Sequence, residues 1–297
     1  MTPREQGFLL LTSQLGDPDR KPLTAAQLRK LAQRANASET PAENRDMTAG
    51  DLLALGYSRE MAQRILTLLS QQEELEYYLR KGRQAGCVPV TRVSTGYPAV
   101  VRSRLGLDSP GCLWAKGDVS LLDTPCVALV GSRDLHAANE AFAREVGRQA
   151  ALQGYTLVSG NARGADRTAQ EACLEAGGRV IVVVADRLES HRCKENVLYL
   201  SEDSFDAAFS AQRALSRNRV IHSLGRRTFV AQCSLGRGGT WDGTVKNLRF
   251  GWSSVLCFND GSEAFRQLEQ MGAALIKLED LQNFEALENK TINLFDQ

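Results

Sequence analysis

The residues of this chain that could do chemistry follow short apolar runs. After YTLVSG, residues 155–160, the sequence continues as NARGADRTAQEA, in which Arg163 and Asp166 stand beside Gly164. Glycine lets a backbone approach a phosphate closely, and the first amides of a following helix point toward such an anion. The pattern predicts an anion site, although a tight turn between a strand and a helix would also use glycine.

Similar residues follow two other apolar runs. Gly131, Ser132 and Arg133 follow CVALV, and the run SLGRGGTWDGT follows TFVAQC. Ligands of parallel sheets bind outside the carboxyl ends of the strands, so we expect the three loops to share one rim. A turn does not need an arginine, which favours a binding site over plain turns.

Basic residues gather in one further segment, AQRALSRNRVIHSLGRR, residues 211–227. On a single helix Arg213 and Arg217 share a face at i,i+4, where like charges repel unless an anion lies between them. Asn218, between Arg217 and Arg219, favours a site for phosphate and base because its amide both donates and accepts hydrogen bonds. A solvated basic face is the alternative.

Composition and motifs argue against several other classes. There are 36 Lys and Arg against 35 Asp and Glu, a net charge of +1, so polyanion binding would need local clustering. Neither GxGxxG nor GxxxxGK[ST] occurs where a dinucleotide cofactor or a P-loop hydrolase would need it. The 7 cysteines include no CxxC pair and the 3 histidines lie far apart. We expect no cofactor, no metal and no membrane span, and a reduced, cytoplasmic protein.

The elements that must position these residues fall into three parts. Residues 1–80 show helical periodicity with Thr24 and Ser58 as predicted N-caps. Within them, DLLALGYSREMAQRILTLL resembles a helix-hairpin-helix or SAM-like module, which either packs against another helix or contacts DNA. Residues 81–125 are rich in Gly and Pro and predict an irregular connection.

From residue 126 to 297 the pattern changes to short β-branched runs that alternate with helical stretches. Continuous apolar strands separated by helices predict a Rossmann-like, doubly wound, mainly parallel α/β sheet. The helical module of residues 1–80 is expected to pack separately from it. After Leu278 we expect one short helix and a tail.

Five segments, in this order, resemble the DNA-processing protein A family, also called DprA or Smf: GYPAVVRSRLGLDSPGCLWAKGD, VALVGSR, GYTLVSGNARGAD, SRNRVIHSL and GGTWDGT. The resemblance spans about residues 95–276. It implies a homodimeric Rossmann-like domain that binds single-stranded DNA in a positive pocket and hands incoming strands to the RecA recombinase. With Gly131, Ser132 and Arg163 from the strand ends, the candidate DNA- or phosphate-binding residues are Arg133, Ser159, Gly160, Gly164, Asp166, Arg217, Asn218, Arg219, Gly239 and Thr240.

The chain also departs from the family pattern. Asn161, Arg163 and Gln170 stand within the usual SGLA.GID..AH, and ADRLESHRCKEN replaces the usual GLD..YP. The predicted function is single-stranded DNA binding without catalysis, in DNA processing, recombination or uptake. We further expect Arg133, Arg163, Arg217 and Arg219 to converge on the DNA.

Two alternatives remain open at this point. Divergent family members also occur as antitoxins or regulatory components of phage-defence loci, where the partner would be a cognate toxin. The LOG phosphoribohydrolases share the fold but use a PGGxGTxxE motif, and GRGGTWDGTVKN lacks both its proline and its glutamate.

Overall fold

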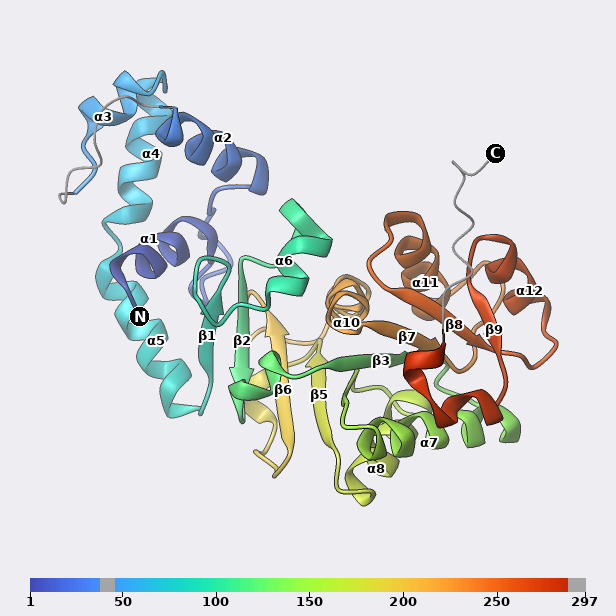
Figure 1. Cartoon of the computed structure of the whole chain (residues 1–297). Coiled ribbons are helices and arrows are strands. Elements are labelled where there is room, and N and C mark those ends of the chain that lie inside the picture. Colours follow the sequence, from blue (N-terminus) through green and yellow to red (C-terminus); the bar gives the residue numbers. More distant parts are fainter. Residues whose placement is uncertain (38–45, 288–297) are drawn as a thin grey trace.

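A nine-stranded sheet runs through the computed structural model, which describes residues 1–37 and 46–287. Its strands are β1 (Val88–Thr91), β2 (Cys112–Lys116), β3 (Cys126–Val130), β4 (Thr156–Ser159), β5 (Arg179–Val184), β6 (Val197–Glu202), β7 (Arg227–Val230), β8 (Ser254–Phe258) and β9 (Ala274–Ile276). Their order in the sheet is β1-β2-β6-β5-β4-β3-β7-β8-β9 (Figure 1). Every pairing from β6 to β9 is parallel, whereas β2 pairs antiparallel with both neighbours. The predicted mainly parallel sheet is confirmed.

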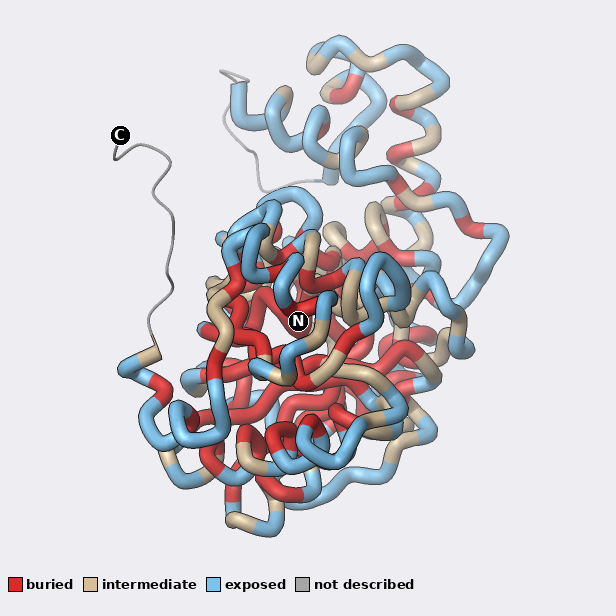
Figure 2. The backbone as a smooth tube through the Cα atoms, turned by 90° about the vertical axis from the view of Figure 1, so that its right-hand side faces the viewer, coloured by how far each residue is buried: buried red, intermediate tan, exposed pale blue. Residues whose placement is uncertain are grey.

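The central strands are apolar along their length, so both faces of the sheet must be covered. All residues of β3, β4 and β7 are buried, and the buried stretches lie together at the centre of the molecule (Figure 2). One face packs against α7 (Ala137–Leu152) and α8 (Ala165–Glu175). The other packs against α6 (Ala99–Leu105), α10 (Asn218–Leu224), α11 (Gly239–Phe250) and α12 (Glu263–Gln270).

The N-terminal helices divide between two cores. They are α1 (Pro3–Thr12), α2 (Ala25–Asn36), α3 (Ala49–Ala54), α4 (Arg59–Leu69) and α5 (Gln72–Gln84). Thr24 and Ser58 cap α2 and α4 as predicted, each accepting a hydrogen bond from a backbone amide three residues on. Helices α2, α3 and α4 share a small core of their own. Helices α1 and α5 instead join the core of the sheet through residues such as Leu9 and Tyr78, so the module does not pack separately as a whole.

Residues 81–125 are more regular than their Gly and Pro content predicts. They supply β1, α6 and β2, and every residue of β2 is buried. The two strands have only 4 and 5 residues, and β1 contains Pro89, which a strand at the edge of a sheet tolerates. Strands this short, one of which contains a proline, lack the alternation of apolar and polar residues by which a strand is recognised in a sequence. The sequence also left β6 and β9 unpredicted.

Two further features differ from the sequence pattern. The helical periodicity that follows the predicted N-cap Ser58 is divided between two helices, because α4 ends at Leu69 and α5 begins at Gln72. After Leu278 the chain forms two 3₁₀ turns, Glu279–Gln282 and Phe284–Ala286, rather than a further α-helix. The end of the expected tail, residues 288–297, lies outside the described residues.

Candidate nucleic-acid interface

The candidate site lies where the winding of the sheet changes direction. From β3 the chain continues through β4, β5 and β6 on one side, and then through β7, β8 and β9 on the other. The loops that follow β3 and β7 therefore diverge and leave a crevice at the carboxyl ends of the strands, where open α/β sheets bind ligands. A pocket of about 580 Å³ occupies this place, between those loops, the start of α11 and the segment from α9 (Ala211–Ser216) into α10.

The structure brings many of the predicted residues to this crevice. Those that line it are Gly131, Ser132, Arg133, Asp166, Arg217, Asn218, Gly239 and Thr240. The others lie outside its lining, at the end of β4, in the loop between β4 and α8, or on α10: Ser159, Gly160, Arg163, Gly164 and Arg219. Ser159, for example, is buried and accepts a hydrogen bond from Gln170 Nε2 at 2.6 Å.

The glycines of the site make room for protein atoms. A Cβ on Gly160 would overlap the guanidinium of Arg217, and one on Gly131 would overlap Ala165. Gly164 has φ +77°, and a Cβ at this position would overlap the backbone carbonyl of Arg133. These positions require glycine because helix, loop and guanidinium pack so closely, and any closeness to a phosphate is a consequence of that packing.

Arg217 is held in the floor of the crevice. Its Nη2 lies 3.9 Å from Asp166 Oδ2, and the two side chains are only 12% and 7% exposed. Burial raises the pKa of Asp166 and lowers the pKa of Arg217, and the attraction between the two opposes both shifts. Asp166 also accepts a hydrogen bond from the amide of Ala162 at 3.2 Å. Asp166 therefore positions both the loop and the arginine.

Other guanidiniums stand at the mouth of the crevice. Arg133 and Arg237 both line it and are exposed, and neither forms an ion pair with a carboxylate in the described part of the chain. Arg163 lies beside the rim, where its Nη2 contacts Asp134 Oδ1 at 2.8 Å. Guanidiniums outnumber carboxylates here, which gives a local positive surface on a chain whose net charge is only +1.

The start of α11 adds hydrogen-bond donors to the same wall. The residue before it, Gly238, has φ +86° and supplies no side-chain cap, so the first amides of the helix have no side-chain acceptor. Thr240 Oγ1 donates to Gly131 O at 3.0 Å, and Asn218 Nδ2 donates to Gly239 O at 3.0 Å. These bonds fix the helix start against the crevice, where its partial positive charge favours an anion.

The expected convergence of four arginines is wrong for Arg219. Its Nη2 lies 3.3 Å from Glu202 Oε1 at the end of β6, away from the crevice lining. Arg213 also turns away and donates from Nη2 to Ser201 Oγ at 2.9 Å. The physical reason is that the basic segment is two helices, α9 and α10, joined at Arg217, so the arginines do not share one helical face.

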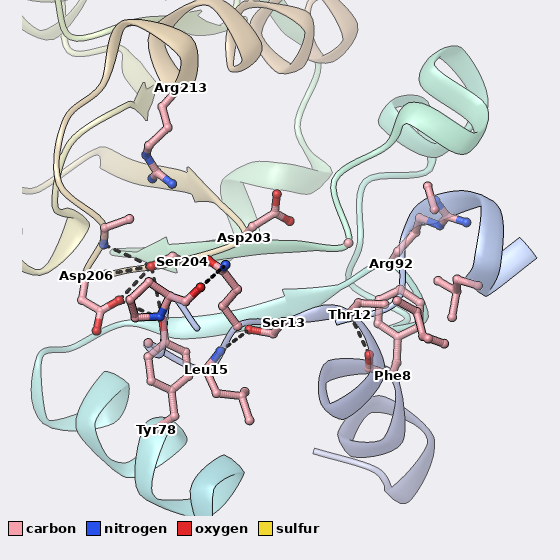
Figure 3. Close-up of a pocket in the computed structure, with 18 of the residues that line it drawn as sticks. Phe8, Thr12, Ser13, Leu15, Tyr78, Arg92, Asp203, Ser204, Asp206 and Arg213 are labelled. Carbon is pink, nitrogen blue, oxygen red and sulfur yellow. Dashed lines mark hydrogen bonds between the residues drawn. The ribbon is translucent and has the colours of Figure 1, made fainter. Parts of the chain in front are cut away.

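A second cavity, of about 640 Å³, lies between the N-terminal helices and the sheet (Figure 3). Tyr78, Ser204 and Asp206 lie together on one side of it, with Arg92 and Arg213 at other sides. Asp206 accepts hydrogen bonds from Tyr78 Oη at 2.9 Å and from Lys81 Nζ at 2.8 Å. Acidic and basic side chains both line this cavity, so it does not offer the one-sided positive surface that a phosphate chain needs.

Sequence reasoning did not select all the residues of the crevice. Arg237, Gln232, Leu215 and Phe209 line it as well. Gln232 Oε1 accepts from the amide of His136 at 2.9 Å, which ties the loops after β3 and β7 together. The signal for Arg237 was its place between two glycines in the run after β7. The loop that carries Phe209 has no pattern that would have indicated a place in the crevice.

No helix within residues 1–37 and 46–287 is long and apolar enough to cross a membrane. The same part of the chain holds no group of three or more His, Cys, Asp and Glu arranged to bind a metal ion.

A family model described as DNA recombination-mediator protein A matches residues 89–251, more than half of the 297 residues. The chain belongs to this family. The match covers β1 from its second residue, the strands β2 to β7 and the whole of α11, and so includes every element that lines the crevice.

Curated relatives in the family are similar over part of their length. DNA processing protein DprA of Bacillus subtilis is 29% identical over 162 residues, which are 50% of this chain and 54% of the relative. DNA processing protein DprA of Streptococcus pneumoniae is 31% identical over 186 residues, which are 57% of this chain and 64% of the relative. The chain thus spans about half the length of the curated relatives it matches.

Solved structures of the family share the fold. The structure of DNA processing protein A from Streptococcus pneumoniae superposes with a TM-score of 0.72 at 25% identity, covering 95% of this chain and 98% of that one. DNA processing protein A from Helicobacter pylori, whose structure was described for its single-stranded DNA binding mode, gives a TM-score of 0.55 at 23% identity, covering 67% of this chain and 93% of that one.

Proposed function

We propose that this chain binds single-stranded DNA in the crevice between β3, β7 and α11, and acts as a recombination mediator. The observation that carries the proposal is the convergence of Arg133, Arg217 and Arg237 with the uncapped start of α11. Guanidiniums and helix-terminal amides are the groups that bind phosphate oxygens, and sequence-independent strand binding rests on them. Family membership supports the same function, as does the strand-binding relative from Helicobacter pylori.

The proposal assigns different roles to the predicted residues. The exposed Arg133 and Arg237 contact phosphates, and Gly239 and Thr240 supply amides at the start of α11. Arg217 contributes from the floor, partly neutralised by Asp166. Gly160, Gly164 and Asn218 position these groups, since their contacts are with protein atoms. Arg163 neutralises Asp134 beside the rim and so removes a negative charge from the path of the strand.

The partners and the assembly follow from the family resemblance. We propose RecA as the protein that receives the bound strand, and a homodimer as the working form in the cytoplasm. We propose no catalytic step: the one carboxylate of the crevice floor, Asp166, is occupied by Arg217 and by the amide of Ala162. Neither the antitoxin nor the phosphoribohydrolase alternative is supported by the comparisons.

Binding of labelled oligonucleotides tests the proposal. We expect the chain to bind single strands more tightly than a duplex of the same sequence, because the crevice follows one backbone and presents no helix shaped for the major groove. Equal or tighter duplex binding would contradict it. Release of free base from nucleoside monophosphates under the same conditions would instead favour the phosphoribohydrolase activity.

A further inference from the structure

The cavity between the N-terminal helices and the sheet has no part in the proposed DNA binding. Its volume is about 640 Å³, and none of its lining residues also lines the crevice. Small-molecule sites in proteins have volumes of this order. In the described part of the chain three residues other than glycine have positive φ, and two of them, Leu15 at +53° and Asp203 at +61°, line this cavity. Backbone strain of this kind clusters at ligand sites.

Asp203 offers a carboxylate to the cavity. It follows β6 directly, it is exposed, and it forms no ion pair within residues 1–37 and 46–287. The protein atoms around the cavity raise its pKa, and the charge of Arg219 and the amide of Cys112 oppose that rise. Glu202 and Asp203 together face Arg213 and Arg219, so the local charges balance. A ligand group at Asp203 therefore needs N–H donors but no positive charge.

The rest of the cavity has an excess of positive charge. Asp206 pairs with Lys81 at 2.8 Å. Arg92 and Arg187 line the cavity as well, and neither pairs with a carboxylate in the described part of the chain. Glu189 is the remaining acidic residue of the described lining. Two guanidiniums against one carboxylate favour an anionic group on the ligand.

Arg92 and Asp203 lie on either side of the start of β2 (Figure 3). The amide of Arg92 donates to Gly111 O and that of Asp203 donates to Cys112 O, both at 2.9 Å. Neighbouring strands are about 4.8 Å apart, so roughly 10 Å separate the two residues across the sheet. The N-terminal segment adds the apolar lining residues Phe8, Leu15, Leu23 and Leu28. A ligand that reaches both ends of the cavity is anionic at one end, carries N–H donors at the other and is largely apolar between them.

A mononucleotide has this layout and length, and the carboxylate selects its base. An ionised carboxylate has two acceptor oxygens and no donor. Guanine presents N1–H and its 2-amino group side by side, whereas adenine, cytosine and uracil each place an acceptor atom next to their donor. We propose that this cavity binds a guanine nucleotide, with the base edge on Asp203 and the phosphate on Arg92. The site is separate from the crevice and does not depend on the proposed DNA binding.

A series of nucleoside monophosphates tests the recognition of the base. Titration calorimetry of the full chain should show binding of GMP. We expect IMP, which lacks only the 2-amino group, to bind about tenfold more weakly, because one hydrogen bond to a charged acceptor is lost. AMP, CMP and UMP should bind more weakly still. Equal binding of GMP and AMP would overturn the proposed base recognition.

Asp203→Asn should change which base is preferred. Asparagine tolerates a φ of +61° as aspartate does, so the melting temperature should match the wild type. Its amide replaces one acceptor oxygen with an N–H donor, and xanthine has a carbonyl oxygen in place of the 2-amino group of guanine. We therefore expect about tenfold weaker binding of GMP together with tighter binding of XMP than in the wild type.

The matched control for this exchange is Asp108→Asn. Asp108 is exposed and close in sequence to the lining residue Ser109, but does not itself line the cavity. This variant should keep the wild-type preference for GMP. Loss of GMP binding in Asp203→Asn without any gain for XMP would leave Asp203 a purely structural role and overturn the inference.

Guanosine, which has no phosphate, tests the other end of the ligand. Arg92→Ala should weaken binding of GMP and leave that of guanosine unchanged. The double variant Arg133→Ala, Arg237→Ala should bind GMP like the wild type, because both residues belong to the crevice. Loss of GMP binding in the double variant would place the nucleotide in the crevice and overturn this inference. Failure of the wild type to bind GMP would also overturn it, and would leave the proposed function untouched, since single-strand binding is measured separately.

Discussion

The arginines of the crevice differ in burial, and therefore in how much the packing of the residues around them depends on their side chains. Arg217 is nearly buried beside Asp166 and under Gly160, whereas Arg133 and Arg237 reach into solvent. From the sequence we expected Arg133 and Arg217 to contact the DNA alike, because residue type does not reveal burial. Removal of the buried one must therefore affect folding as well as binding.

Arg217→Ala tests this difference. Without the guanidinium the buried carboxylate of Asp166 loses its ion-pair partner, so we expect a loss of about 3 kcal/mol in the free energy of unfolding. Arg133→Ala should change it by less than about 0.5 kcal/mol. Urea denaturation measures both. Equal stability of the two variants would contradict the buried position of Arg217.

Gly160→Ala tests the close packing of the Arg217 guanidinium against Gly160. The added methyl group would overlap the guanidinium of Arg217 and force it out of the floor. We expect weaker single-strand binding together with a lower melting temperature. Gly7 in α1 has no atom within 4 Å of the place a Cβ would take, so Gly7→Ala is the control that should lose neither. Wild-type binding by Gly160→Ala would show that the contact is dispensable.

Among the elements, α10 joins the crevice to a buried polar group. His222 lies within α10, and its Nδ1 lies 3.1 Å from Asn247 Nδ2 of α11 and 3.3 Å from Thr228 Oγ1 of β7. Asn247 donates in this contact, so Nδ1 accepts and the ring is neutral. Burial, with the charge of Arg217 as a lesser cause, lowers the pKa of His222 to about 3.

That shift predicts a pH dependence of stability. Between about pH 6.5, the ordinary pKa of histidine, and pH 3 the unfolded chain binds a proton that the folded chain does not. Stability must therefore fall as the pH is lowered through this range, by up to about 1.4 kcal/mol per pH unit from this group. His222→Gln should show a shallower fall when unfolding by urea is followed at pH 7, 6 and 5. An identical slope in both proteins would contradict the neutral, buried histidine.

Elements with strong local patterns were predictable and the others were not. The apolar runs of β3, β4, β5, β7 and β8 indicated a parallel sheet, and the polar residues after them indicated the rim. The break between α9 and α10 was not predictable, because Arg217 and Asn218 continue a helical pattern and only tertiary packing separates the two helices. β1 and β2 form because β6 offers an edge for pairing, which no local pattern shows.

In the whole molecule, the N-terminal helices are tied to the sheet through Asp206. Its carboxylate accepts hydrogen bonds from Lys81 and Tyr78 of α5 and from Ser204. Burial acts to raise the pKa of Asp206, but these bonds outweigh it and the pKa is lowered. A lowered carboxyl pKa stabilises the fold above the ordinary range of Asp, and this stabilisation is lost as the pH falls through the folded pKa.

Asp206→Asn is expected to reduce the free energy of unfolding by about 2 kcal/mol at pH 7, since it removes a hydrogen-bonded ion pair. The difference from the wild type should shrink toward pH 3. Asp108→Asn, at an exposed carboxylate of the same protein, is the control that should be neutral. A difference that stays constant down to pH 3 would contradict the role of the charged form.

The net charge of the chain is close to zero, so DNA binding in the crevice depends on local charge alone, and the salt dependence of single-strand binding measures that local contribution. If Arg133 and Arg237 each neutralise one phosphate, replacing both with Ala should flatten the slope of log K against log salt by about 1.4, or 0.7 for each contact. Arg226→Ala is the matched control, because Arg226 is exposed, pairs with Glu285 at 3.2 Å and precedes β7, at the opposite end of the strand from the crevice. We expect an unchanged slope for Arg226→Ala and the flattened slope for the double variant. An unchanged affinity and slope in the double variant would place the DNA outside the crevice.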